Sequence, residues 1–256
     1  MSPEHPDPER FHLDTLAPLL KAYQKRFRCK VVAFIDFCSL FQKPRDEAQD
    51  ALFAQGLSAL TLIYGHQHTI VWCLTRAPPA TQRGYRDRGW CTFEPTVASA
   101  LKKGISLLDM GLLEVAPSAV TDFEAEVMFV CNKASRRPPL TREAFAEVLA
   151  TKHFTNGSSD HELVVRLYGD FVREALGSAK ALDFGDLDWG DAEARQVAEA
   201  MTLCPGLLSL NLCGNLNIGD AGVRALAASL PSGLEQLDLS QNKVGKAGAS
   251  ALLAAI

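Results

Sequence analysis

The stretch LEQLDLSQNKV, residues 234–244, decides the fold of the C-terminal part of this chain. Its leucines and its asparagine follow the spacing LxxLxLxxN, and LLSLNLCGN, residues 207–215, has the same spacing 27 residues earlier. The LxL centre of each stretch predicts a short strand whose alternate leucines face inward. We expect the asparagine to hydrogen-bond neighbouring main-chain groups where the chain turns.

An alanine-rich segment with helical spacing follows each of these stretches. Residues 219–230 read GDAGVRALAASL, and residues 245–256 read GKAGASALLAAI. A weaker copy begins at Leu182-Asp-Phe184, 28 residues ahead of its counterpart, and continues as GDAEARQVAEAM over residues 190–201. A strand–turn–helix unit leaves two sides unburied, so such units must stack. The sequence therefore predicts about three repeats over residues 179–256, the last of them truncated.

The frame, the alanine-rich helix and the period of 27–28 residues together resemble the ribonuclease-inhibitor type of leucine-rich repeat. The resemblance implies a short solenoid that binds a protein partner through the side chains between the buried leucines. The first copy has Leu187 in place of the asparagine, as in a capping repeat, and the last copy ends without a polar cap. The partner-binding residues expected on this basis are Asp183, Ser209, Asn211, Gln236 and Asp238.

Composition and charge limit the classes of function and partner that fit this chain. The net charge of −4 does not favour nucleic acid as a partner, and no apolar run reaches the roughly 18 residues of a membrane span. Seven cysteines without a CxxC pair are expected to be free thiols in a reducing cytoplasm, with no metal site. Residues 181–256 hold nine acidic and four basic residues, a balance of −5. We therefore expect the partner of the repeats to have a basic surface.

Apolar patterns in the N-terminal part predict alternating helices and strands. A continuous apolar run predicts a strand buried on both faces, whereas apolar residues three and four apart predict a helix. Pro95 is expected in the first turn of its helix. The alternation predicts a parallel α/β sheet with helices on both faces, followed by a helical connector over residues 135–178. The predicted helices span 10–28, 45–64, 90–103, 141–152 and 160–176, and the predicted strands span 31–37, 69–75 and 126–131.

Polar residues follow two of the predicted strands, 31–37 and 69–75. Ligands bind beyond the carboxyl ends of parallel strands, where these residues are expected to meet. The alternatives are purely structural roles, in which Asp36 caps a helix and Trp90 belongs to the core. The predicted ligand cleft consists of Asp36, Ser39, Gln42, Tyr85 and Trp90.

Two motifs in this region resemble known domains. Tyr85, Trp90-Cys91 and Glu94 resemble the YxxSxWCxxE signature of TIR (Toll/interleukin-receptor) domains. DFCSLFQ, residues 36–42, followed by Ile63-Tyr64, resembles the DxxCIxQ…IY pattern of fungal HET (heterokaryon incompatibility) domains, which are similar to TIR domains.

The resemblance implies a TIR/HET-like α/β domain over residues 1–134. The family's first strand has no counterpart here, as expected of a fragment or of a diverged gene model. In catalytic TIR domains the glutamate of WCxxE cleaves NAD at the nicotinamide bond, so Glu94 is the implied catalytic residue and NAD the implied substrate. The alternative is that Glu94 is favoured at a helix start by the helix dipole.

Two functions follow from these patterns. The first is a cytoplasmic signalling protein, similar to immune-type receptors, that binds a partner through its repeats and oligomerises through the TIR-like domain. The second is an NAD-cleaving enzyme that uses Glu94. Neither requires a bound cofactor.

Overall fold

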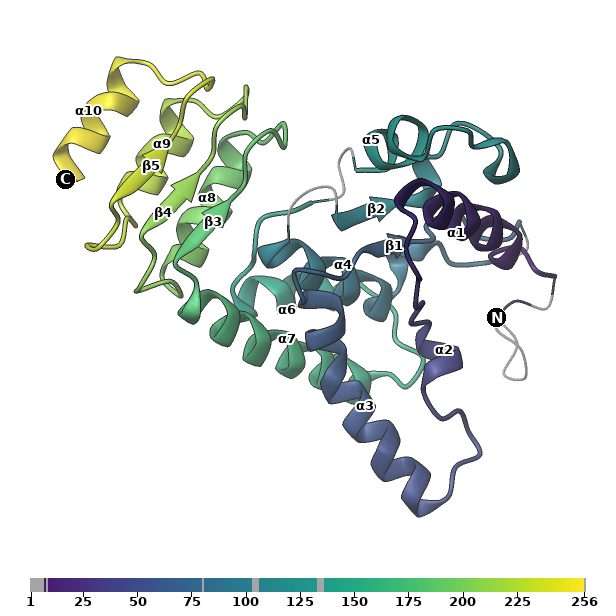
Figure 1. Ribbon diagram of the computed structural model, residues 1–256. Helices are drawn as coiled ribbons and strands as arrows, with labels where there is room; N and C mark the ends of the chain where they lie inside the picture. The colour runs from purple at the N-terminus through teal and green to yellow at the C-terminus, as the bar shows by residue number, and fades with distance from the viewer. Residues whose placement is uncertain (1–6, 8, 80, 103–105, 133–135, 256) are drawn as a thin grey trace.

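The computed structural model describes residues 7, 9–79, 81–102, 106–132 and 136–255. It is a mixed α/β protein in which helices surround a small sheet in the N-terminal part, and three strands lie side by side in the C-terminal part (Figure 1). None of the helices in these residues is both long and apolar enough to cross a membrane.

Three N-terminal helices predicted from the sequence are confirmed. They are α1 (Leu13–Phe27), α3 (Glu47–Gly65) and α4 (Gly89–Leu101). A capping box begins α3, because the Asp46 carboxylate accepts the Gln49 main-chain N–H at 2.8 Å and the Gln49 side chain accepts the Asp46 N–H. In α3, apolar periodicity and a start signal therefore agree.

The position of Pro95 differs from the prediction. Because α4 begins at Gly89, Pro95 is the seventh residue of the helix and lies in its second turn, together with Glu94. A proline inside a helix costs about 3 kcal/mol or more. Phe93 and Val97 are fully buried on either side of it, and their packing outweighs that local cost.

The strand predicted over residues 31–37 is wrong. Residues 29–35 are extended without strand pairing, and α2 (Asp36–Ser39) begins where the strand was expected to continue. Val32 is 96% exposed, and Phe34 packs against Tyr64 with ring centroids 6.2 Å apart. An apolar run becomes a buried strand only where neighbouring strands and helices cover it, and in the described residues nothing covers Val32.

The strand predicted over residues 126–131 is also wrong, because this segment is helical. A π-helix, Glu124–Met128, continues into α5 (Phe129–Cys131). The Asp122 carboxylate accepts the N–H groups of Glu124 and Ala125. The Glu126 carboxylate accepts those of Thr121 and Asp122. Short apolar runs do not distinguish a strand from a helix, and these capping groups decide for the helix.

The N-terminal sheet therefore has two parallel strands in the described residues. The prediction over 69–75 is confirmed by β1 (Val71–Cys73), which pairs with β2 (Leu107–Asp109), a strand that the sequence reading missed. The short helical turns that complete this part are Tyr85–Asp87, Met110–Leu112 and Pro117–Ala119.

Two helices join this part to the repeats. They are α6 (Arg142–Ala150), whose N-cap Thr141 accepts the Ala144 N–H through its side chain, and α7 (Ser158–Ser178). Buried side chains of α4, α6 and α7 belong to the same apolar cluster as those of the first repeat. One continuous core thus connects the N-terminal helices to the C-terminal strands.

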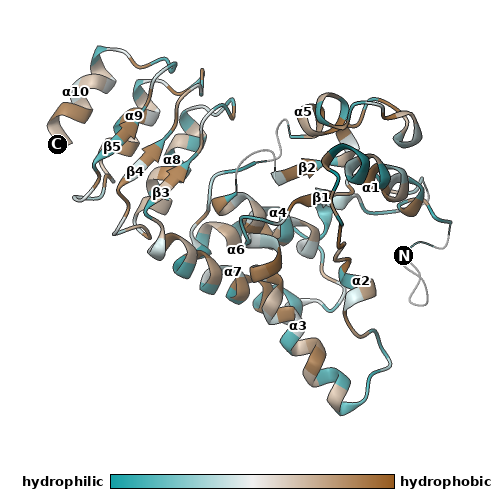
Figure 2. Cartoon of the chain, viewed as in Figure 1, coloured by the Kyte–Doolittle hydropathy of each residue, from teal (hydrophilic) through white to brown (hydrophobic). Residues whose placement is uncertain are grey.

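The C-terminal part repeats a strand and a helix three times, as predicted. The strands pair in parallel, with Leu182 beside Leu210 and Leu210 beside Leu237. Hydrophobic residues run along β3 and β4 in Figure 2. The elements are β3 (Ala181–Asp183), α8 (Asp191–Met201), β4 (Ser209–Asn211), α9 (Asp220–Ala227), β5 (Gln236–Asp238) and α10 (Lys246–Ala255).

Candidate functional site

The strands of the repeats present a row of polar side chains between their buried leucines. Leu182 and Leu210 are 4% and 1% exposed, whereas Leu237 on the edge strand is partly exposed. The five side chains expected to face a partner flank these leucines on the three strands, and all are exposed or partly exposed. They are Asp183, Ser209, Asn211, Gln236 and Asp238.

Hydrogen bonds hold this row in place. The Asn211 amide donates to the Asp183 carboxylate at 2.9 Å, and the Ser209 hydroxyl lies 3.4 Å from the Gln236 side-chain oxygen. Hydrogen bonds from Ser240 lower the pKa of Asp238. The row therefore has a negative charge at each end, with an amide between them, on side chains that are already oriented.

A buried asparagine fixes the turns behind the row, as its place in the repeat predicted. Asn215 is fully buried, and its amide donates to the carbonyl oxygens of Phe184 and Leu212. Its side-chain oxygen accepts the N–H groups of Leu187 and Trp189 in the first repeat. Leu187 thus occupies the asparagine position of the first repeat and is held by the asparagine of the second.

A second set of polar residues was not singled out from the sequence. The Asp191 carboxylate accepts the N–H groups of Gly219 and Gly222, at the start of the next helix. Asp220 does the same for Gly245 and Gly248 of the third repeat. The recurring GDAG and GKAG sequences were the available signal. These carboxylates hold successive repeats together.

Two of the predicted site residues, Asp36 and Glu94, interact electrostatically. Burial raises the pKa of Glu94 to about 8, and the negative charge of Asp36 adds to the shift. Burial raises the pKa of the Tyr85 hydroxyl most, and the charges of Cys73 and then of Glu94 raise it further. Tyr85 therefore belongs to the same cluster. Burial raises the pKa of the Cys73 and Cys91 thiols to about 12.

This cluster has limited chemistry at neutral pH. A carboxyl group with a pKa of about 8 is mostly protonated at pH 7, so Glu94 is suited to donating a proton or a hydrogen bond. Thiols with a raised pKa are poor nucleophiles, because the thiolate is the reactive form. The described residues contain no group of three or more histidine, cysteine or acidic side chains placed to hold a metal ion.

The remaining residues of the predicted ligand cleft make other contacts. The Trp90 indole N–H donates to Asp160 of α7 at 3.2 Å, so Trp90 anchors α4 on the connector. The Ser39 hydroxyl oxygen accepts the Ile35 N–H at the start of α2, and the Gln42 amide donates to the Leu40 carbonyl oxygen. These three side chains support the structure locally.

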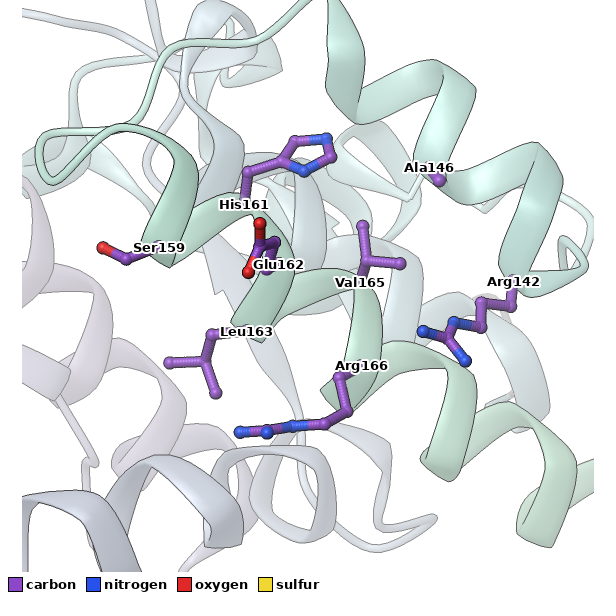
Figure 3. Close-up of a pocket in the computed structure, with 8 residues that line it drawn as sticks. All are labelled: Arg142, Ala146, Ser159, His161, Glu162, Leu163, Val165 and Arg166. Atoms are coloured by element: carbon purple, nitrogen blue, oxygen red, sulfur yellow. The ribbon is translucent and has the colours of Figure 1, made fainter.

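A shallow groove of about 500 Å³ lies between α6 and α7 (Figure 3). It is wide open, and both basic and acidic side chains line it. The stem of Arg142 lies against Gly169, where a methyl group would come within 2.7 Å of the arginine Cδ. None of its lining residues was predicted as functional: Arg142, Ala146, Ser159, His161, Glu162, Leu163, Val165 and Arg166.

Two segments of the chain match the Leucine Rich repeat family. These segments, residues 204–227 and 234–253, cover the second and third repeats. The first repeat, with β3 and α8, pairs with them in the same parallel register. Searches of curated proteins and of solved structures gave no significant match to the chain. The chain therefore contains leucine-rich repeats, whose stacked strands typically provide extended surfaces for protein binding.

Proposed function

We propose that this protein is a cytoplasmic signalling protein that binds a partner protein through the polar row on β3, β4 and β5. The observation that carries the proposal is the ordered row itself, in which Asn211 bridges toward Asp183 and the charge at Asp238 is stabilised. Oriented polar side chains lose little conformational freedom on binding, which favours affinity.

The proposed partner has a basic surface. The repeats have a balance of −5, and the exposed carboxylates of Asp183 and Asp238 stand at opposite ends of the row. Exposed charges of opposite sign accelerate association and are screened over about 8 Å at physiological ionic strength. Binding is therefore expected to weaken as salt is added.

A peptide-binding measurement tests this function. Fluorescently labelled peptides rich in arginine and lysine, and acidic peptides of the same length, are titrated with the protein while their anisotropy is recorded. The double variant Asp183→Asn, Asp238→Asn removes two charges from the row. The matched control, Glu174→Gln with Glu199→Gln, removes two charges from exposed positions on α7 and α8.

Selective binding of basic peptides by the wild type and the control, with loss in the row variant, supports the proposal. Equal binding by all three proteins contradicts it, as does an affinity that is unchanged between low and high salt.

A second candidate function is cleavage of NAD by a TIR-like domain. The cluster of Glu94, Asp36 and Tyr85 supports this candidate, because a residue with a raised pKa and a charged neighbour is typical of catalytic sites. A mostly protonated Glu94 is less suited to stabilising an oxocarbenium ion, so we rank this function below partner binding.

Nicotinamide release distinguishes the two functions. The purified protein is incubated with NAD, and the wild type is compared with Glu94→Gln and with the exposed control Glu162→Gln on α7. Release by the wild type and the control that disappears in Glu94→Gln supports the enzyme. Background release by all three proteins contradicts it.

A further inference from the structure

Arginines are concentrated between β1 and α4. Residues 74–88 contain four arginines and one acidic residue, Asp87, a balance of +3. The arginines are exposed or partly exposed, and they form the arginine cluster: Arg76, Arg83, Arg86 and Arg88. A surface with this excess of positive charge favours an acidic partner.

Hydrogen bonds to main-chain carbonyl groups orient two of these arginines. The Arg76 Nε donates to the Gly111 carbonyl oxygen at 3.1 Å, and its Nη2 donates to that of Leu113 at 2.7 Å. The Arg88 Nη2 donates to the Arg83 carbonyl oxygen at 3.0 Å. A carbonyl oxygen carries no net charge, so these bonds fix each guanidinium without neutralising it. Since a guanidinium has five N–H donors, further donors remain for a carboxylate.

Asp109 anchors a third arginine at the carboxyl edge of the N-terminal sheet. It is the last residue of β2, and its carboxylate lies 3.4 Å from the Arg86 Nη2. The Asp109 side chain is 9% exposed and also accepts hydrogen bonds from the Thr75 hydroxyl and the Gly111 N–H. The Arg86 side chain remains 71% exposed. Counting Asp109 with residues 74–88 leaves a balance of +2, and Arg86 is open to a partner.

The polar row on the repeat strands has the opposite charge. Its two charged residues, Asp183 and Asp238, are acidic and exposed, and no basic residue belongs to the row. They hold matching positions on β3 and β5 with β4 between them, so their Cα atoms lie about 9–10 Å apart, at two strand spacings. These strands lie away from β1 and β2 in Figure 1, so the row does not meet the arginine cluster of its own chain.

We propose that the arginine cluster of one copy of this protein binds the polar row of a second copy. The proposal rests on the proposed function, because it names the partner of the same row. The row and the cluster are different surfaces, so the contact is head to tail, and successive copies form a ring or an open chain. Guanidinium and carboxylate groups pair with defined geometry, and the opposite charges accelerate association.

Two variants of the full chain test this contact. Arg83→Gln with Arg86→Gln removes charge from the cluster and keeps the row, whereas Asp183→Asn with Asp238→Asn does the reverse. Sedimentation equilibrium of the wild type at low salt is expected to show self-association that weakens as salt is added. In each variant alone, we expect the dissociation constant to rise roughly tenfold.

Mixing the two variants gives the sharper result. The intact row of one variant can meet the intact cluster of the other, so an equimolar mixture is expected to form a one-to-one complex and no larger species. The matched control, Arg166→Gln with Arg195→Gln, removes two positive charges from exposed positions on α7 and α8 and should self-associate like the wild type.

The proposal is overturned by a wild type that is monomeric at every concentration, by a mixture that forms no complex, or by a control as defective as the cluster variant. The peptide titration described above separates this failure from that of the proposed function. If the row binds basic peptides while the wild type stays monomeric, the row binds a different protein and the second copy is excluded. If the row binds no basic peptide and the wild type is monomeric, both proposals fail.

Discussion

The guanidinium of Arg136 donates a hydrogen bond to the main-chain carbonyl oxygen of Asp183 at 2.6 Å. Arg136 is 7% exposed, and its Nε donates to the Ser99 carbonyl oxygen near the end of α4. Its guanidinium lies 4.7 Å from the centre of the Phe184 ring, and its own carbonyl oxygen accepts the Trp189 indole N–H. One buried cation thus joins the N-terminal helices to the first repeat.

Removing this cation is expected to destabilise the whole protein. Arg136→Ala leaves the carbonyl oxygens of Ser99 and Asp183 without a donor, and each buried group left unpaired costs about 1–3 kcal/mol. The free energy of unfolding, measured with urea, should fall by at least that amount. Arg137→Ala, at the exposed neighbouring position, should change it by less than about 0.5 kcal/mol. Similar losses in both variants would contradict the joining role of Arg136.

The leucines of the repeats are expected to differ in their contribution to stability. Leu210 is 1% exposed on the central strand, and truncating a buried leucine to alanine costs about 2–5 kcal/mol. Leu237 is partly exposed on the edge strand β5, so Leu237→Ala should cost less. Gln236→Ala, at an exposed position on β5, should cost within about 0.5 kcal/mol. Unfolding in urea measures all three, and equal costs would mean that the assigned strand register is wrong.

The repeats were predictable because their residues constrain one another. Leu210 and Asn215 recur with fixed spacing in neighbouring units, so strand, turn and helix were predicted together and in register. Val32 and Val127 lie in isolated apolar runs. The sequence of such a run is similar whether the run folds as a strand, as a helix or as an exposed extended segment. The outcome there depends on capping by Asp122 and on which surfaces cover the chain, and neither is encoded in the run itself.

The residues of the two candidate sites also differ in how far the sequence alone could place them. Positions on the repeat strands follow from the alternation of side chains along a strand, so the placement of Asp183 and Asp238 could be predicted. The approach of Asp36 to Glu94 was expected from two strands that end at one edge. In the structure the first of those strands is absent and Asp36 lies at the start of α2, and its charge still adds to the raised pKa of Glu94.

The carboxylate of Asp220 is expected to stabilise the contact between the second and third repeats. Asp220→Ala leaves the N–H groups of Gly245 and Gly248 without their acceptor, and loss of such a cap costs about 0.5–2 kcal/mol. Lys246→Ala is the matched control, because Lys246 holds the same place in the third repeat as Asp220 in the second. Thermal unfolding followed by circular dichroism compares the two. An equal loss in both variants would argue against the capping role.

The stability of the protein is expected to depend on pH through Glu94. Its pKa is about 8 in the folded protein, well above the value of about 4.3 for an unperturbed glutamate. Between these values the folded protein retains a proton that the unfolded chain has lost. The contribution of Glu94 to stability is therefore fully present below about pH 4 and is lost as the pH rises toward 8, by at most about 1.4 kcal/mol for each pH unit.

Glu94→Gln isolates this effect, because glutamine keeps the shape of the neutral carboxyl group and cannot ionise. The variant should match the wild type near pH 4 and become progressively more stable than the wild type up to pH 8, as measured by urea unfolding at each pH. Glu162→Gln, at an exposed position on α7, should track the wild type within about 0.5 kcal/mol throughout. The charge of Asp36 adds to the raised pKa, so Asp36→Asn should lower the pKa of Glu94, and the loss of stability should end at a lower pH and be smaller in total. A difference between Glu94→Gln and the wild type that is constant with pH would mean that Glu94 is already ionised in the folded protein.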